Sequence, residues 1–224
     1  MAKINNWDLA QGDLAHRIEQ LNLVGMKSVL LAYIVYSLGR AEGQKRPPLV
    51  PTEKVLCRLH QAATVFLLKQ PGQYRRFKVS VGREGFTVFE PPHWNEIPRL
   101  IREFFDDLAV LWTTGDPLDI AAFALWRITW IHPFRDGNGR TAFAFAYACL
   151  CLKLGALLPH ADTILDQMLS HPAQCNGPLR VADESIEANP RGQPDLSQLK
   201  YYYDQLLLKQ IQSAEAIQRA APAQ

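Results

Sequence analysis

Two strongly apolar segments, with a polar break between them, constrain the fold of this chain most. Residues 118–130 are almost all apolar, and a second apolar segment runs from 142 to about 154. Segments of this length that are apolar on every side are typical of helices buried in a core. Between them lies HPFRDGNGR, the nine residues from His132 to Arg140, whose proline and glycines interrupt the helical pattern. The sequence therefore predicts a polar loop held between two buried helices.

Most of the remaining sequence also has a helical period. A β-hairpin is predicted at 74–89, where apolar and polar residues alternate before a glycine-containing turn. We therefore predict an all-α fold, a helical bundle around the central helix that follows the polar loop, with one small hairpin. Irregular chain is expected around 172–178. The other expected helices span about 9–36, divided in two near Gly25, then 52–68, 95–112, 163–169 and 195–211.

The chain of 224 residues is expected to form one domain with short additions at its ends. Residues 1–51 are an N-terminal helical region. Residues 52–212 are the core, which includes the hairpin at 74–89 and the loop at 132–140, and residues 213–224 are a C-terminal tail.

Composition and charge exclude several classes of partner. The formal net charge of +2 is too small to favour nucleic acid or an anionic membrane surface. The apolar stretch 142–158 is interrupted by Lys153 and is shorter than the roughly 20 residues that span a bilayer. Residues 1–8 lack the pattern of a signal peptide, so we expect a cytoplasmic protein. Buried thiols are expected at the four cysteines, which are Cys57, Cys149, Cys151 and Cys175.

The start of the helix after the loop has the features of a phosphate site. Asn138 and Gly139 open this helix, so several backbone N–H groups there lack an intrahelical acceptor. Helix N-termini bind anions, and the glycines at 137 and 139 let a ligand approach the backbone closely. Arg140 is a cation in the first turn, where it opposes the helix dipole unless an anion is bound as well. These residues together predict a cradle for a phosphate group.

Two other side chains of the loop could act on a bound phosphate ester. Asp136 would repel phosphates unless a divalent cation such as Mg²⁺ lay between them. His132 is the group that can accept a hydroxyl proton at neutral pH. Each residue alone could be a helix cap or part of a turn, and their joint occurrence in nine residues favours a site. The dinucleotide-binding pattern G-x-G-x-x-A also matches from Gly137, but the strand that should precede it is missing.

The segment from His132 to Arg140 resembles the signature of the Fic family, HPFx(D/E)GNGR. YRRFKVSVG at 74–82, followed by FEPP at 89–92, resembles the hairpin flap of that family. PDLSQLKYYYDQLL at 194–207 resembles its closing helix. The resemblance covers much of 74–207 and implies the largely helical Fic fold.

The resemblance also implies the chemistry of a protein adenylyltransferase. By position, His132 is the general base and Asp136 the Mg²⁺ ligand. The implied reaction is attack by a Ser, Thr or Tyr hydroxyl of a target protein on the α-phosphorus of ATP, with pyrophosphate leaving. The residues that correspond to the phosphate and nucleotide site are Gly137, Asn138, Gly139 and Arg140.

The hairpin is expected to dock the target protein. A two-stranded hairpin leaves backbone groups unpaired at its edge, and an extended target segment could add there as a further strand. A purely structural flap is the alternative. The candidate docking residues are Lys78, Val79, Ser80 and Val81.

The sequence departs from the family pattern at Phe143. Many members have a second arginine at this position, which helps hold the terminal phosphate and pairs with an inhibitory glutamate. The segment SLGRAEG at 37–43 resembles the inhibitory element imperfectly, so Glu42 is either an inhibitory residue or a charge at the end of a helix. Because phenylalanine cannot hold a carboxylate, we expect Glu42 to stay in solvent or to turn to Arg140.

These observations leave three functions open. The leading hypothesis is AMP transfer from Mg-ATP to a protein hydroxyl, including self-modification. The second is transfer from another donor, such as UTP, GTP or CDP-choline, or use of ATP as a kinase. The third is a catalytically silent module that binds nucleotide and a partner. A homodimer is left open, and the sequence does not specify the target protein.

Overall fold

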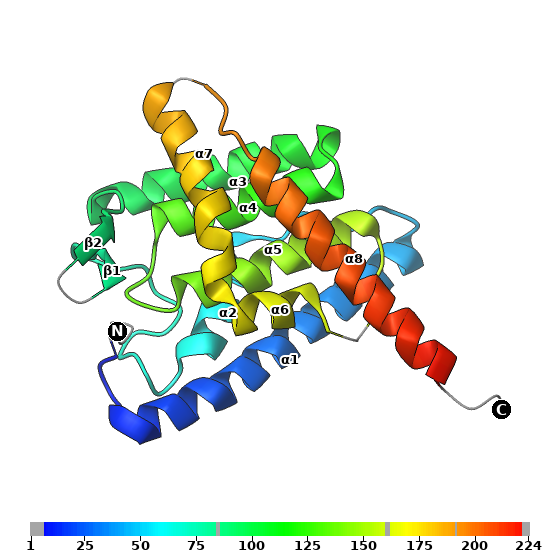
Figure 1. Cartoon of the computed structure of the whole chain (residues 1–224), viewed down its shortest axis with the longest axis horizontal. Helices are drawn as coiled ribbons and strands as arrows, with labels where there is room; N and C mark the ends of the chain where they lie inside the picture. Colours follow the sequence, from blue (N-terminus) through cyan, green and yellow to red (C-terminus); the bar gives the residue numbers. More distant parts are fainter. Residues whose placement is uncertain (1–6, 84–85, 160–161, 191, 221–224) are drawn as a thin grey trace.

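Two helices joined by the polar loop form the centre of the molecule (Figure 1). The computed structural model describes residues 7–83, 86–159, 162–190 and 192–220. Helix α4 spans Pro117–Ile131, α5 spans Asn138–Leu154, and the two pack against each other. Every residue of α5 from Arg140 to Leu152 is buried. The predicted pair of buried helices around a polar loop is therefore confirmed.

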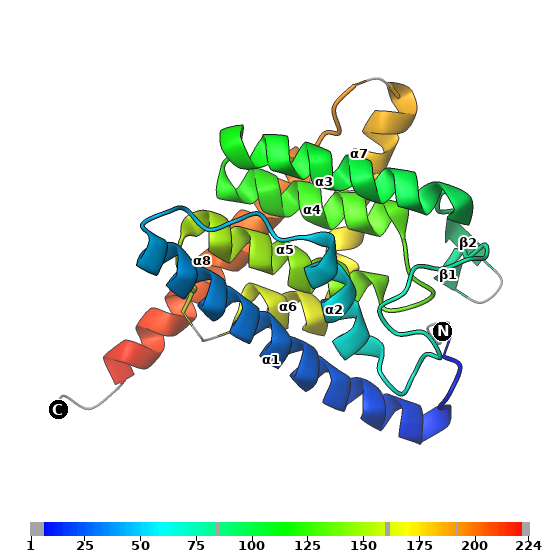
Figure 2. The ribbon, with the colours of Figure 1, turned by 180° about the vertical axis from the view of Figure 1, so that it is seen from behind.

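The other helices cover this pair on two sides. Helices α1, α2 and α6 pack on α5, whereas α3, α7 and α8 pack on α4. Figure 2 shows this arrangement from behind, with α3 beside α4 and α1 along the lower edge. The predicted all-α fold with one small hairpin is confirmed. The bounds are α1 Gly12–Gln44, α2 Glu53–Thr64, β1 Val81–Arg83, β2 Phe86–Phe89, η1 Trp94–Glu96, α3 Ile97–Thr114, α6 Ile164–Ser170, η2 Pro172–Cys175, α7 Asn176–Ala188 and α8 Ser197–Ala220.

The hairpin is shorter than the alternating sequence predicts. Its strands pair antiparallel, with Val81 opposite Phe89 and an irregularity between Val81 and Gly82. The alternation from Phe77 onward does not form a strand before Val81. In this segment the carbonyl oxygen of Phe77 accepts a hydrogen bond from the side chain of Arg75. Of the four candidate docking residues, Val81 alone lies in β1, and the other three lead into it.

Helix α1 is continuous through Gly25, so the prediction of two helices was wrong. A glycine inside a helix costs ~1 kcal/mol, which is less than the burial of neighbouring side chains contributes. Met26, Leu30 and Ile34 lie on one side of α1 and are completely or almost completely buried. They belong to the same hydrophobic core as α4 and α5. The N-terminal region is therefore packed into the core rather than set apart from it.

Three other helix boundaries differ from the sequence prediction. Helix α2 ends at Thr64 because Val65 has an extended ψ of 139°, and Phe66 follows with a left-handed φ of 62°. Helix α7 begins inside the segment 172–178, which was expected to be irregular, and continues through 179–188, where no element was predicted; Pro178 lies in its first turn, where proline is tolerated. Helix α8 continues to Ala220, so most of the predicted tail is helical, and residues 221–224 lie outside the described part.

Helix α1 is also long and apolar enough to cross a membrane, judged by length and composition alone. Its most apolar window has a mean hydropathy of 1.5, and 22% of that window is buried inside the molecule. The inner side of α1 is accounted for by the core. On its outer side, apolar residues such as Leu21 and Val35 are exposed.

Candidate active site

The loop between α4 and α5 rests on His60 of α2. The His60 ring is fully buried and stacks on Phe134, with ring centroids 3.7 Å apart. Its Nδ1 atom accepts the N–H of Gly72 at 2.8 Å, so the hydrogen is on Nε2, which donates to the carbonyl oxygen of Asp136 at 2.9 Å. Burial lowers the pKa of His60 to about 4. The ring is therefore neutral at pH 7, as both hydrogen bonds require.

Asn138 closes the loop onto the start of α5. Its Oδ1 atom accepts the N–H of Phe134 at 2.8 Å, and its Nδ2 atom donates to the carbonyl oxygen of the same residue at 2.9 Å. The side chain of Asn138 thus shapes the loop, because both of its polar atoms bond to the backbone of Phe134. Gly137 has φ of 76°, and a Cβ atom there would lie 2.7 Å from Thr64. Gly139, by contrast, has open space beside it.

Arg75 ties the loop to the base of the hairpin. The side chain is buried, and Nε donates to the carbonyl oxygen of His132 at 2.8 Å. Its two terminal nitrogens donate to the carbonyl oxygens of Phe77 at 3.0 Å and Pro92 at 2.7 Å. The backbone N–H of Arg75 donates to Pro133 at 2.9 Å. One side chain therefore joins the two ends of the hairpin segment to the residue expected to act as base.

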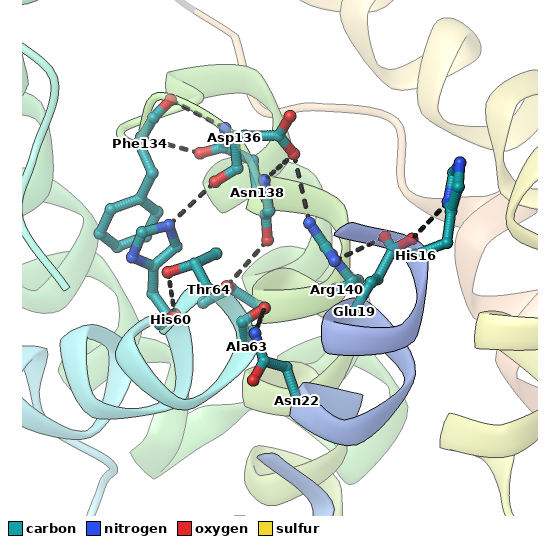
Figure 3. A network of polar contacts seen from close by, with 12 residues as sticks. His16, Glu19, Asn22, His60, Ala63, Thr64, Phe134, Asp136, Asn138 and Arg140 are labelled. Atoms are coloured by element: carbon teal, nitrogen blue, oxygen red, sulfur yellow. Dashed lines mark hydrogen bonds and ion pairs between the residues drawn. The ribbon is translucent and has the colours of Figure 1, made fainter. Parts of the chain in front are cut away.

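Arg140 lies between two carboxylates, as Figure 3 shows. One terminal nitrogen is 2.6 Å from Oε1 of Glu19, and the other is 3.2 Å from Oδ1 of Asp136. The side chain of Arg140 is 8% exposed, that of Asp136 9% and that of Glu19 17%. Because Glu19 comes from α1, the N-terminal helix contributes directly to this site. A phosphate that binds Arg140 has to displace or rearrange these carboxylates.

Asp136 is the one predicted metal ligand. Its Oδ1 atom accepts the N–H of Gly137 as well as the guanidinium of Arg140. Across the described part of the chain, no three His, Cys, Asp or Glu side chains are grouped so that they could hold a metal ion by themselves. Mg²⁺ is commonly held by one or two carboxylates together with substrate phosphates. Asp136 at the start of α5 fits that kind of shared binding, in which the phosphates supply most of the ligands.

His132 ends α4 in a left-handed conformation, with φ of 49° and ψ of 57°. Its Nδ1 atom is 3.3 Å from the carbonyl oxygen of Thr129. When Nδ1 carries the hydrogen and donates to Thr129, the lone pair of Nε2 is free to accept a proton. Desolvation by the surrounding chain lowers the pKa of His132 to about 4. The ring is therefore neutral at pH 7, though less basic than an ordinary histidine.

Glu42 does not take part in this arrangement. It is exposed near the C-terminal end of α1, 23 residues after Glu19, which corresponds to ~35 Å along a helix. Of the two positions expected for Glu42, in solvent or at Arg140, the structure shows the one in solvent. The carboxylate that meets Arg140 is that of Glu19 instead. Phe143 is 5% exposed and packs in the core, so the position of the family's second arginine is filled by an apolar side chain.

Three residues of the site were missed in the sequence: Glu19, His60 and Arg75. A signal existed for Glu19, because it shares a helical face with Ala15 and Met26, which are apolar and buried. A carboxylate on the inward face of a helix usually has a partner. His60 and Arg75 gave no such signal, since their partners are backbone atoms that only the folded chain brings near.

Comparison with known proteins places this site in a family. Residues 50–150 match the model of the Fic/DOC family. A curated relative, "Protein adenylyltransferase fic-1" from Caenorhabditis elegans, is 40% identical over 73 residues, which make up 33% of this chain and 14% of that protein. The chain thus spans only a small part of the relative's length.

Two solved structures of Fic proteins share this fold. A Fic domain containing signaling protein from Bacteroides thetaiotaomicron superposes with a TM-score of 0.68 at 20% identity, covering 96% of this chain and 78% of the other. Fic-1 from C. elegans superposes with a TM-score of 0.63 at 17% identity, covering 96% and 56%. The superposed structures show the fold, and the family-model match, which contains the HPFRDGNGR loop, shows that residues 50–150 form a Fic/DOC domain.

Proposed function

We propose that this protein transfers AMP from Mg-ATP to a hydroxyl group of a target protein. The observation that carries the proposal is the loop from His132 to Arg140, which joins a neutral histidine to a helix N-terminus and a buried arginine. The similarity to a protein adenylyltransferase over 73 residues supports the same reaction. That relative is much longer than this chain, and its activity supports the proposal through sequence similarity.

In the proposed reaction, the protein binds and orients the phosphates and removes one proton. The N–H groups at the start of α5 and the guanidinium of Arg140 would hold phosphate oxygens. Nε2 of His132 would accept the proton of the attacking hydroxyl. The oxygen then bonds to the α-phosphorus as the bond to pyrophosphate breaks. Mg²⁺, bound by Asp136 together with the phosphates, would neutralise the charge that develops on them.

The test is label transfer from ATP labelled at the α-phosphorus, with Mg²⁺, to proteins of a cell lysate or to the protein itself. We expect label with the wild-type chain and none with His132→Ala. His171→Ala is the matched control, because His171 is exposed and lies outside the loop. Absence of label with wild type, or equal label with His132→Ala, contradicts the proposal. The melting temperature verifies that the His132→Ala protein is folded.

A different donor is the second candidate, and Phe143 favours it. The buried phenylalanine cannot contact a terminal phosphate as an arginine would. A donor that lacks a γ-phosphate, or that binds in another orientation, therefore loses less binding energy from the missing arginine. Parallel reactions with ATP labelled at the α- or the γ-phosphorus, and with UTP, GTP and CDP-choline, separate the alternatives. Label from the γ-position identifies a kinase. Nucleotide binding without transfer from any donor identifies a silent module.

We further propose that the target docks at the hairpin. Val81 lies in β1, and Arg75 connects the start of the hairpin segment to His132. A target segment added at the edge of β1 would therefore lie on an element that is joined to the proposed general base. Val81→Pro removes one backbone N–H from β1. We expect it to reduce labelling of targets more than binding of ATP. Equal losses in both measurements indicate a structural flap.

A further inference from the structure

The side chain of Arg135 connects the loop to two parts of the chain that are far from it in sequence. One terminal nitrogen of Arg135 is 2.8 Å from Oδ1 of Asp8, in the chain before α1. The guanidinium carbon of Arg135 lies 5.2 Å from the centroid of the Phe77 ring, in the segment that leads into β1. We call these three residues, Asp8, Arg135 and Phe77, the loop bridge.

Asp8 is held in place by contacts of its own. Its backbone N–H donates to the carbonyl oxygen of Leu67 at 2.8 Å, and its Oδ2 atom accepts the N–H of Lys69 at 3.2 Å. The neighbouring Trp7 packs against a small apolar cluster that contains Leu67. The side chain of Asp8 is 14% exposed, so its attraction for a cation is screened less than that of a surface carboxylate. Asp8 therefore gives the loop bridge a fixed anion at one end.

The backbone on either side of Arg135 is fixed as well. Asn138 bonds to the N–H and the carbonyl oxygen of Phe134, and His60 donates to the carbonyl oxygen of Asp136. The side chain of Arg135 therefore leaves the loop in a set direction. A planar guanidinium can form an ion pair at its edge and lie over an aromatic ring with its face, so one arginine can make both contacts.

Phe77 is the end of the loop bridge that depends on side-chain contacts. In the described chain, strand β1 begins at Val81, so residues 77–80 precede the ladder. The ring of Phe77 is 41% exposed and does not belong to the core. A terminal nitrogen of Arg75 holds the carbonyl oxygen of Phe77 at 3.0 Å, and the guanidinium of Arg135 holds the ring. One contact thus fixes the backbone of Phe77, and the other fixes the direction of its side chain.

The direction of the Phe77 ring determines how the docking segment is presented. Val79 and Val81 are half-buried, whereas Lys78 and Ser80 are exposed. This alternation is that of extended chain, in which side chains at every second position share one side. Phe77 lies at the start of the set that includes Val79 and Val81. A ring held on one side therefore sets the orientation of all the residues that follow it up to β1.

We propose that Arg135 is a positioning residue for the protein target: anchored by Asp8, it holds Phe77 and so keeps the docking segment 78–81 in a fixed place relative to His132. This inference rests on the proposed docking of the target at the hairpin. Arg135 has no part in binding the nucleotide. Loss of the loop bridge therefore slows transfer to proteins and leaves the binding of Mg-ATP unchanged.

Backbone ¹⁵N relaxation at residues 78–81 tests the loop bridge without any catalytic activity. We expect order parameters of ~0.85 in the wild type, as in rigid backbone, and below ~0.6 in Arg135→Met and Phe77→Leu. Phe77→Tyr keeps an aromatic face for the guanidinium and should resemble the wild type. The control is Arg102→Met, because Arg102 is exposed on α3. Low values already in the wild type, or equally high values in every variant, overturn the proposal.

Asp8→Asn tests the anchor separately. The amide oxygen can still accept the N–H of Lys69, but the side chain no longer carries the charge that attracts Arg135. We expect order parameters at 78–81 that lie between those of the wild type and those of Arg135→Met. Values equal to the wild type overturn the anchoring by Asp8.

The second test compares transfer with nucleotide binding. The rate of label transfer from ATP labelled at the α-phosphorus to lysate proteins is measured at saturating Mg-ATP, and the Kd for Mg-ATP by calorimetry. We expect Arg135→Met and Phe77→Leu to lower the rate at least about fivefold and to change the Kd less than about twofold. Phe77→Tyr and Arg102→Met should match the wild type, and melting temperatures verify folding. A weaker Kd that accounts for the whole loss would make Arg135 a nucleotide ligand and overturn the proposal.

The third test is the double variant that combines Arg135→Met with Phe77→Leu. If the guanidinium and the ring act through each other, the second change adds little to the first, and the double variant transfers label as fast as the slower single variant. Losses that multiply overturn the loop bridge. A wild-type chain that labels no protein, while the order parameters change as expected, contradicts the proposed function and supports the loop bridge.

Discussion

At the scale of single residues, the contact between Glu19 and Arg140 occupies the guanidinium that the proposed reaction requires. The two side chains are 2.6 Å apart and mostly buried, so their attraction is screened less than that of surface ions. A nucleotide phosphate needs the same guanidinium. Glu19→Gln removes the competing charge, and we expect it to raise the affinity for ATP by about five- to a hundred-fold, the equivalent of ~1–3 kcal/mol.

The measurement for Glu19→Gln is calorimetric titration with Mg-ATP. Glu42→Gln is the matched control, because it removes the same charge from the same helix at an exposed position. It should bind ATP like the wild type. If both variants match the wild type, then Glu19 does not restrain Arg140.

His60 gives the fold a defined dependence on pH. The unfolded chain protonates this histidine below its ordinary pKa of 6.5, whereas the folded chain does so only below about 4. Between these values the unfolded state binds more protons, so stability falls as pH decreases from 6.5 to 4 and is unaffected by this group above that window. The contribution is up to ~3 kcal/mol.

The test of His60 is chemical denaturation at several pH values. His60→Gln has no group that titrates in this window and should lose part of the decline in stability between pH 6.5 and 4. The control His171→Gln, at an exposed position, should keep the wild-type profile. Identical pH profiles for all three proteins would show that His60 is not the cause.

At the scale of elements, Arg75 makes the hairpin base and the loop one unit. Its three side-chain hydrogen bonds end on carbonyl oxygens of His132, Phe77 and Pro92. Lysine keeps the charge but cannot present the planar fork that makes these contacts. We expect Arg75→Lys to lower the transfer rate at saturating ATP at least tenfold, with little change in the KM for ATP, because the position of His132 changes and the phosphate cradle does not.

Steady-state kinetics with ATP measures this effect, and Arg76→Lys is the control, since the neighbouring side chain is exposed. A loss of activity in Arg75→Lys that merely tracks the fraction of unfolded protein would assign Arg75 to stability alone. The melting temperature, measured on the same samples, separates the two results.

At the scale of the whole molecule, α1 is part of the core and not an addition to it. Ile34 is completely buried and Val35, the next residue, is 52% exposed. Ile34→Ala should lower the free energy of unfolding by ~2–5 kcal/mol, because it leaves a cavity, whereas Val35→Ala should change it little. Chemical denaturation of the two variants and the wild type provides the comparison. Equal and small effects would mean that α1 folds apart from the rest.

The sequence was sufficient for the central part of this fold. Apolar residues on every side of 118–130 and 142–154 required burial, and proline and glycine in the intervening loop required a break, so the loop and its two helices were predictable. Period alone did not show that α1 is one helix reaching Gln44, and it missed α7. Burial of Met26 overrides the helix-breaking tendency of Gly25, and a proline in a first turn is compatible with a helix.

The supporting contacts of the site were less predictable than its motif. The residues of the loop were recognisable because they are adjacent in sequence. Glu19, His60 and Arg75 act on the loop from 57 to 121 positions away, through hydrogen bonds that depend on how α1, α2 and the hairpin pack. Glu42 was chosen for its local sequence, and only the course of a continuous α1 shows that Glu19 is the residue that meets Arg140.

The pairing of Arg140 with Glu19 also implies a particular response to ionic strength. Binding of a nucleotide to an open cation creates an ion pair, and added salt weakens it by screening. In the proposed function, a carboxylate of the protein leaves Arg140 as a phosphate arrives, so one ion pair is exchanged for another. Salt weakens both the starting contact and the final one. In that exchange Glu19 acts as an intramolecular counter-ion. The net binding of phosphate at Arg140 then depends on the difference between the affinity of Arg140 for the phosphate and its affinity for the Glu19 carboxylate.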